Sequence, residues 1–170
     1  MDRGIDINLG SDIGMSPHRK GDWWRDNTVA VLNAAAELGD IDLFDHLVSL
    51  GAKPDQSNAM CHAAKSRKGA SMIPHLIEKY HLDINTDDKR GGLNNLPPWN
   101  ITEKFPLRYA ASSHNLAGVE ALLKCGAKDD DVYRSLKKWY NRDEKFLDPE
   151  CTSILKLLLD AGANLSEVLG

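Results

Sequence analysis

The sequence predicts an all-α fold, a solenoid of stacked helix-turn-helix repeats with two or three enlarged loops. Three observations predict it. Apolar residues recur at helical spacing in paired short segments, and adjacent alanines recur in the first segment of a pair. Closing positions at Gly4, Gly51, His81, Gly126 and Gly162 are separated by 47, 30, 45 and 36 residues. These separations scatter around the roughly 33 residues of a two-helix repeat, and the two longest contain the longest loop-like stretches.

The clearest unit spans residues 105–128, FPLRYAASSHNLAGVEALLKCGAK. Leu107, Ala110 and Ala111 form the apolar side of a first helix, and Val119 and Leu122 that of a second helix after a polar turn. The small alanines allow a neighbouring helix to approach closely, whereas the leucines supply area to bury. One such hairpin buries too little apolar surface to offset its ordering entropy, so neighbouring units must cover it.

This segment resembles an ankyrin repeat, whose consensus reads roughly T-P-L-H-x-A-A-x-x-G, then a second helix ending in V-x-x-L-L, then G-A. The resemblance implies a scaffold that recognises a partner. It extends to residues 28–56, where Ala30 to Asn33 stand in place of T-P-L-H, which leaves open how neighbouring turns are tied together. In that unit we expect Leu43, Phe44, Leu47 and Val48 to face inward from the second helix, and Asp40 or Asp42 to cap it.

Further repeats are expected at approximately 57–85 and 129–165, within a repeat region of 28–170. Insertions are expected at 86–104 and 141–150 because Gly, Pro and polar residues dominate there. Residues 1–27 are interpreted as a partial repeat ending, DRGIDIN, followed by a long loop. Either the chain starts inside a longer array or its first repeat is vestigial. Outer units of this kind predict end-to-end self-association, or capping by residues 9–27.

Composition narrows the partner classes. The formal net charge of −4 gives no broad basic field, which argues against nucleic acid as a partner. No apolar run has the length of a signal peptide or a membrane span, so we expect an intracellular protein, cytoplasmic or nuclear, with no membrane partner. The three cysteines have no metal-ligand spacing and are interpreted as reduced thiols. We expect no cofactor and no metal.

A protein partner is therefore the main expectation. The tryptophans of the loop-like stretches fall outside the positions that build the stacked core, and tryptophan is enriched at interface hot spots. The ankyrin resemblance implies further contact positions on the concave face, just before the first helices and just after their paired alanines, with Tyr109 bordering the same surface. The candidate partner-binding residues are Trp23, Trp24, Asp26, Asn27, Glu37, Lys65, Trp99, Lys104, Tyr109, Ser112 and Ser113.

The alternative is a small-molecule-binding protein or enzyme with a pocket between the insertions and the concave face. Its candidate residues are His62, Arg108 and His114, because the two histidines flank first helices of different repeats and can approach one another near Arg108. Catalytic motifs do not support it: HExxH, GxSxG, the P-loop and GxGxxG are all missing from the sequence. The acidic run at 129–131 lacks EF-hand ligand spacing and fits helix capping better.

Overall fold

The computed structural model describes residues 7–8, 29–88, 105–129 and 149–162. All regular secondary structure in these residues is helical, which confirms the predicted all-α fold for this part of the chain. The α-helices are α1 (Ala30–Leu38), α2 (Ile41–Ser49), α3 (Ala59–Lys65), α4 (Met72–Glu78), α5 (Pro106–Ser112), α6 (Leu116–Lys124) and α8 (Pro149–Asp160), with short 3-10 helices η1 (Pro54–Gln56) and η2 (Lys68–Ser71).

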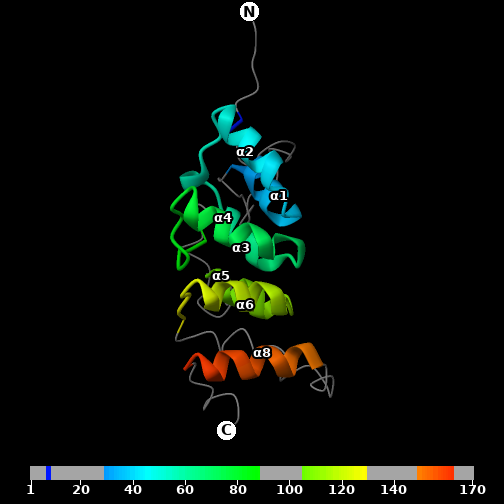
Figure 1. The fold of residues 1–170 in the computed structure, drawn as a ribbon. Coiled ribbons are helices and arrows are strands. Elements are labelled where there is room, and N and C mark those ends of the chain that lie inside the picture. The colour runs from blue at the N-terminus through cyan, green and yellow to red at the C-terminus, as the bar shows by residue number, and fades with distance from the viewer. Residues whose placement is uncertain (1–6, 9–28, 89–104, 130–148, 163–170) are drawn as a thin grey trace, which may run out of the picture.

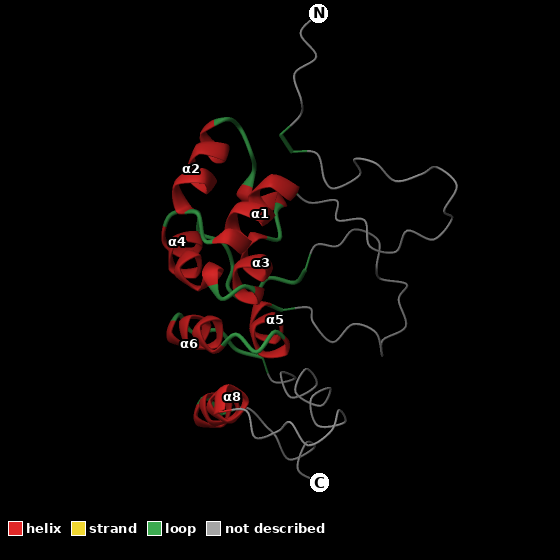
Figure 2. Ribbon diagram, turned by 90° about the vertical axis from the view of Figure 1, so that its right-hand side faces the viewer, coloured by secondary structure: helices red, strands yellow, loops and turns green. Residues whose placement is uncertain are grey.

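The helices lie in a row of antiparallel pairs from the N-terminal to the C-terminal end of the molecule (Figure 1). Seen from the side, α1, α3 and α5 form one column, and α2, α4 and α6 form a second column beside it (Figure 2). Within the first column α3 packs between α1 and α5, and at the C-terminal end α8 packs against α6. Each helix pair thus covers the apolar side of its neighbour.

Paired alanines explain the close packing of the first column. They occupy the same place on each of its helices and are fully buried: Ala35 and Ala36, Ala63 and Ala64, Ala110 and Ala111. Because an alanine projects no bulk beyond its methyl group, α3 can contact α1 on one side and α5 on the other. Larger side chains fill the space between the columns, namely Leu32, Phe44, Met60, Met72, Ile73, Leu76 and Leu122, with Ile154 and Leu158 added by α8.

Side-chain caps and left-handed residues set the helix ends. Asp40 accepts a hydrogen bond of 2.9 Å from the backbone amide of Leu43, so Asp40 rather than Asp42 caps α2. Asn115 caps α6 in the same way, accepting from the amide of Gly118 at 3.1 Å. Gly39 ends α1 with a φ of 71°, a left-handed conformation that glycine adopts without a steric penalty.

The closing positions identified by their spacing share one backbone conformation. Gly51, Gly126 and Gly162 have positive φ angles of 102°, 89° and 89°, and His81 has a φ of 54°. Left-handed residues at these positions reverse the chain after a second helix. Gly4, the first member of the series, lies outside the described residues.

One detail of the predicted units differs from the structure. Of the four residues expected to face inward from the second helix of the first unit, Phe44 is fully buried and Leu47 and Val48 are partly buried against the core, whereas Leu43 is exposed. Leu43 and Phe44 are adjacent on α2 and project about 100° apart, so only one of them can point directly at the core. In the second unit the connection between the helices is long, because residues 65–71, KSRKGAS, continue into the 3-10 helix η2 before α4 begins.

Candidate binding site

The face formed by α1, α3 and α5 carries a small pocket. Its volume is ≈ 40 Å³, and its lining residues come from α3, from α5 and from the segment that follows α4: Asn58, Cys61, His62, Lys65, Asp88 and Tyr109. A space of this size holds one or a few water molecules or a single small side-chain group. Three of the residues expected to meet a partner or a ligand, His62, Lys65 and Tyr109, therefore share one depression.

A chain of hydrogen bonds fixes the floor of this pocket. The Asn33 Oδ1 atom on α1 accepts from the backbone amide of Asn58 at 2.8 Å, in a buried contact. The Asn58 side-chain amide then donates to Asp88 at 2.9 Å, and the Tyr109 hydroxyl donates to the other oxygen of the same carboxylate. Two donors therefore stabilise the Asp88 charge, and side chains from α1, α3 and α5 are held in a fixed relationship.

His62 connects the pocket to α1. Its Nδ1 atom lies 2.9 Å from the Glu37 carboxylate, and both side chains are partly exposed. A carboxylate only accepts hydrogen bonds, so Nδ1 carries the proton in this contact. Glu37 is therefore not a free negative charge on this face, because the imidazole N–H orients it.

Lys65 ends α3 at the rim of the pocket and is exposed. Within the described ranges its ammonium group has no hydrogen-bond or ion-pair partner. The acidic side chains of this face, Glu37 and Asp88, already bind His62, Asn58 and Tyr109. The rim of the pocket thus carries an uncompensated positive charge.

The other predicted contact residues divide into two groups. Ser112 and Ser113 lie at the C-terminal end of α5, half-buried, and the Ser112 hydroxyl donates to the Tyr109 carbonyl oxygen at 3.2 Å. Their position extends the same face beyond Tyr109. The remaining candidates lie outside the described residues: Trp23, Trp24, Asp26, Asn27, Trp99 and Lys104.

His62, Arg108 and His114 each bind a different partner. Arg108 forms a buried ion pair with Asp129, and the Nδ1 atom of His114 lies 3.3 Å from the Cys151 sulfur at the start of α8. His62 instead contacts Glu37. Each of the three groups therefore has a structural role in joining neighbouring elements, and only His62 lines the pocket.

Sequence reasoning missed Asn58 and Asp88, although both line the pocket. The available signal for Asn58 was a polar residue directly before the apolar run of α3, where a buried amide needs partners. Asp88 had no comparable signal because it follows α4 by several residues, in a stretch interpreted as an insertion. Its role depends on donors from two other elements, which the local sequence does not reveal.

The opposite column carries a second polar cluster, centred on Asp45 of α2. Its carboxylate accepts hydrogen bonds from three groups of the following unit: His75 Nε2 at 2.8 Å, Lys79 Nζ at 2.6 Å and the Tyr80 hydroxyl at 2.6 Å. Burial disfavours the charge, but the bonds from Lys79, Tyr80 and His75 outweigh burial and hold the pKa of Asp45 well below its usual range. This cluster therefore ties α2 to α4.

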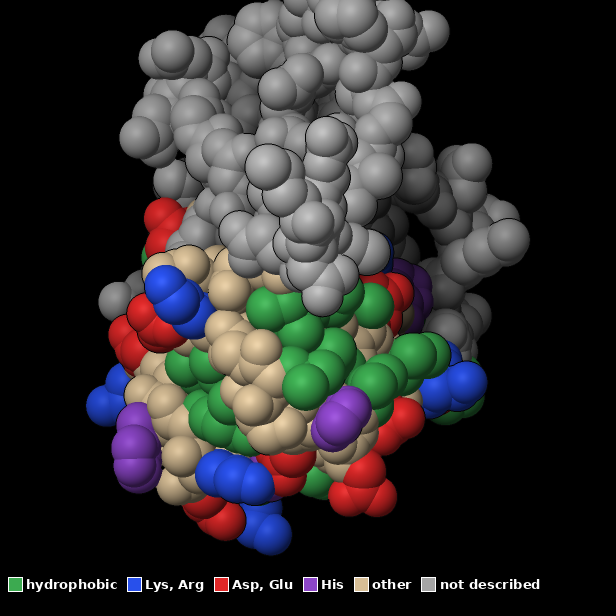
Figure 3. Space-filling model, turned by 90° about the horizontal axis from the view of Figure 1, so that it is seen from above, with side chains coloured by type: hydrophobic (Ala, Val, Ile, Leu, Met, Phe, Trp, Pro, Cys, Tyr) green, Lys and Arg blue, Asp and Glu red, His purple; other side chains and the backbone are tan. Residues whose placement is uncertain are grey.

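Apolar side chains gather at the N-terminal end of the row. Viewed from that end, a green surface lies over the first helix pair (Figure 3). Val31 and Leu38 on α1, Leu43 on α2 and Leu50 directly after α2 are exposed, and so is Leu159 on α8. Of the described residues, no other large apolar side chain is exposed to this degree, so α3 to α6 contribute none.

The described residues contain no cluster of His, Cys, Asp or Glu that could hold a metal ion. Among the helices of this part of the chain, none is long and apolar enough to cross a membrane. No family model matches the sequence, and no curated protein matches it either.

Proposed function

We propose that this chain is an ankyrin-like solenoid that binds another protein through the face formed by α1, α3 and α5. The observation that carries the proposal is the gathering of Glu37, His62, Lys65 and Tyr109 around one polar pocket on that face. Protein interfaces combine such polar contacts with partly buried aromatic groups. The hydrogen-bond chain beneath the pocket holds the face rigid, which lowers the entropy cost of binding.

Repeated hydrogen bonds support the solenoid interpretation. The Asn8 side chain accepts from the amide of Lys53 at 2.9 Å and donates to the carbonyl of Gly51 at 3.1 Å. Asn85 accepts from the amide of Lys128 at 3.0 Å. Both asparagines end the sequence Asp-Ile-Asn and both lysines follow Gly-Ala, so equivalent residues make equivalent contacts between successive units.

The pocket lined by His62, Lys65 and Tyr109 is too small to enclose a metabolite by itself. Small-molecule sites usually enclose roughly 300–1,000 Å³, and the described residues form a pocket of ≈ 40 Å³. A space this small suits one side chain of a partner that rests mainly on the surrounding surface. His62 is also held by Glu37 and Arg108 by Asp129, which leaves both engaged in structural contacts.

Ala34 offers a position on α1 for testing this face. It lies directly before the paired alanines of its helix, as His62 does on α3 and Tyr109 on α5, and both of those side chains line the pocket. Ala34 is exposed, so a larger side chain can be placed there without entering the core. Ser112 provides a second position, at the C-terminal end of α5.

The experiment compares two pairs of substitutions that add the same charge. The test pair, Ala34→Arg and Ser112→Arg, places arginines on α1 and α5; the control pair, Ala117→Arg and Ser49→Arg, replaces the same residue types on α6 and α2. Partners are captured from a cell lysate with the unmodified chain and identified, and the affinity of each is then measured by calorimetry. We expect the test pair to weaken binding about tenfold or more, a cost of about 1.4 kcal/mol.

The control pair should bind within about twofold of the unmodified chain, since a peripheral substitution changes affinity little. Circular dichroism melting curves of both pairs should match, because none of the four positions is buried. Loss of binding in the control pair alone would assign the interface to the other column and overturn the proposal.

A further inference from the structure

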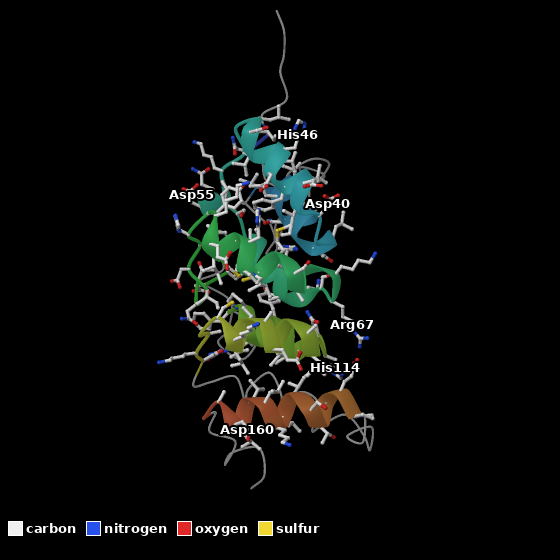
Figure 4. All side chains as sticks on the ribbon, viewed as in Figure 1. Asp40, His46, Asp55, Arg67, His114 and Asp160 are labelled. Atoms are coloured by element: carbon white, nitrogen blue, oxygen red, sulfur yellow. The ribbon has the colours of Figure 1, made fainter. Side chains whose placement is uncertain are left out.

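The turn that follows α3 concentrates positive charge. Residues 65–68, KSRK, place Lys65, Arg67 and Lys68 within four positions, and all three are exposed. Arg67 lies at the edge of the row where first helices end and second helices begin, the edge that also holds Asp40 and His114 (Figure 4). This local positive charge contrasts with the formal net charge of −4 of the whole chain.

Neighbouring units hold this turn in place. The Asn115 side-chain amide donates to the carbonyl oxygens of Ala64 at 2.7 Å and Ser66 at 2.9 Å. On the other side, a Cβ atom added at Gly39 would lie 2.1 Å from the Lys68 carbonyl oxygen, so the two backbones are in direct contact. Contacts with both neighbouring units therefore fix the backbone that carries the three cations.

The chain compensates only part of this charge. Arg67 donates to the Glu150 carboxylate at the start of α8, and both side chains of this pair are at least one-third exposed. Lys65 and Lys68 have no ion-pair or hydrogen-bond partner among residues 7–8, 29–88, 105–129 and 149–162. Because water and salt screen an exposed ion pair, Glu150 competes only weakly with an external carboxylate.

We propose that an acidic segment of the protein partner docks on this turn, with its carboxylates paired to Lys65, Arg67 and Lys68. The inference rests on the proposed function and specifies the chemistry of the partner. Lys65 belongs both to the turn and to the rim of the pocket, so a segment bound to the turn continues onto the face formed by α1, α3 and α5. The Arg67–Glu150 pair shows the contact that such a carboxylate replaces.

The test uses a fluorescent peptide of alternating Glu and Gly, with the Gln-Gly peptide as its uncharged counterpart. Binding is followed by fluorescence anisotropy at low and at physiological salt. We expect the acidic peptide to bind, the Gln-Gly peptide not to bind, and added salt to weaken the complex, because exposed charges are screened within about 8–10 Å at physiological ionic strength.

Substitutions identify which charged side chains bind the acidic peptide. Lys65→Gln with Lys68→Gln should weaken peptide binding about tenfold, a loss within the range of complementary charge pairs. The matched pair Lys124→Gln with Lys156→Gln removes the same charge from exposed positions on α6 and α8, and it should bind within about twofold of the unmodified chain. Glu150→Gln should strengthen binding about twofold to fivefold, since it frees Arg67 from its internal carboxylate.

Equal losses in the two lysine pairs would show attraction by overall charge and would overturn the inference, as would failure of the acidic peptide to bind at low salt. This outcome is separable from failure of the proposed function. One outcome is that Ala34→Arg with Ser112→Arg abolishes binding of a captured protein while Lys65→Gln with Lys68→Gln leaves it unchanged. In that case the face binds a partner, but the inference of an acidic segment is wrong. If no substitution on α1 or α5 affects capture, the proposed function fails even where the peptide binds.

Discussion

Arg108 and Asp129 form a two-point ion pair in which both side chains are buried. The Nε–Oδ2 and Nη2–Oδ1 distances are 2.5 and 2.7 Å, and the side chains are 7% and 5% exposed. Arg108 lies two residues before the paired alanines of α5, as Asn33 does on α1, and both side chains bind the beginning of a following segment. Two chemically different residues thus perform the same task of joining neighbouring units.

The first prediction concerns this pair. Arg108→Met should lower the free energy of unfolding by about 3–5 kcal/mol, because it leaves the Asp129 carboxylate buried without its partner. The double change Arg108→Met with Asp129→Leu should recover most of that loss, since an apolar pair of similar size carries no desolvation penalty. Urea unfolding at neutral pH, followed by circular dichroism, measures both. A double variant as unstable as the single one would contradict this account.

The second prediction concerns acid unfolding. The pKa of Asp45 is lower in the folded chain than in the unfolded chain, so the unfolded chain binds more protons as the pH falls. The stabilisation is therefore present above about pH 4, the ordinary range of an Asp carboxyl, and is lost progressively below it. Asp45→Asn should lower the free energy of unfolding by roughly 1–3 kcal/mol at neutral pH. It should also make that free energy fall less steeply between neutral and acid pH.

Asp42→Asn is the matched control for Asp45→Asn. Asp42 lies on the same helix, is exposed and makes no contact with α4 in the described part of the chain. Its substitution removes the same charge, so it should shift urea midpoints little and equally at every pH. If both variants lost stability to the same extent as the pH falls, the hydrogen bonds of Asp45 to the following unit would not be the cause of acid unfolding.

The third prediction concerns the Tyr80 hydroxyl. Burial, followed by its hydrogen bond and proximity to the Asp45 carboxylate, raises the pKa of Tyr80 well above the usual value for tyrosine. Its contribution to stability is present below about pH 10 and is lost as the pH rises further, because the unfolded chain ionises first. Asp45→Asn should bring the pKa of Tyr80 closer to the usual value. Ultraviolet absorbance titration measures this shift, with Tyr80→Phe identifying its signal.

The helices and their closing positions could be predicted because their causes are local. Paired alanines and spaced leucines mark the buried sides, and glycines mark the reversals. The spacing even identified His81 as a closing residue, and it adopts the left-handed conformation without being glycine. Leu43 shows the limit of this reasoning, because it is as apolar as its buried neighbour Phe44 and yet is exposed.

The polar contacts between units could not be predicted, because they depend on how one unit is positioned against the next. Asp45 gains three donors from α4 and the residues after it, and Asp88 gains donors from α3 and α5. Nothing in the local sequence distinguishes Asp45 and Asp88 from solvent-exposed aspartates. His114 likewise resembled a pocket residue, but its ring reaches Cys151 on α8. Only the stacked arrangement brings such partners together.

The fourth prediction compares two glycines that share a left-handed conformation but differ in surroundings. A Cβ atom at Gly51 meets no atom within 4 Å, whereas one at Gly39 would collide with the backbone of Lys68. Gly51→Ala should therefore cost about 1–2 kcal/mol from backbone strain alone. Gly39→Ala carries the same strain and must also displace the 65–68 turn, so its urea midpoint should fall further.

Because that displacement moves Lys65 and Lys68, Gly39→Ala should also weaken binding of the acidic peptide, while Gly51→Ala leaves it unchanged. Equal stability losses in the two variants, with peptide binding unaffected, would show that Gly39 does not hold the turn.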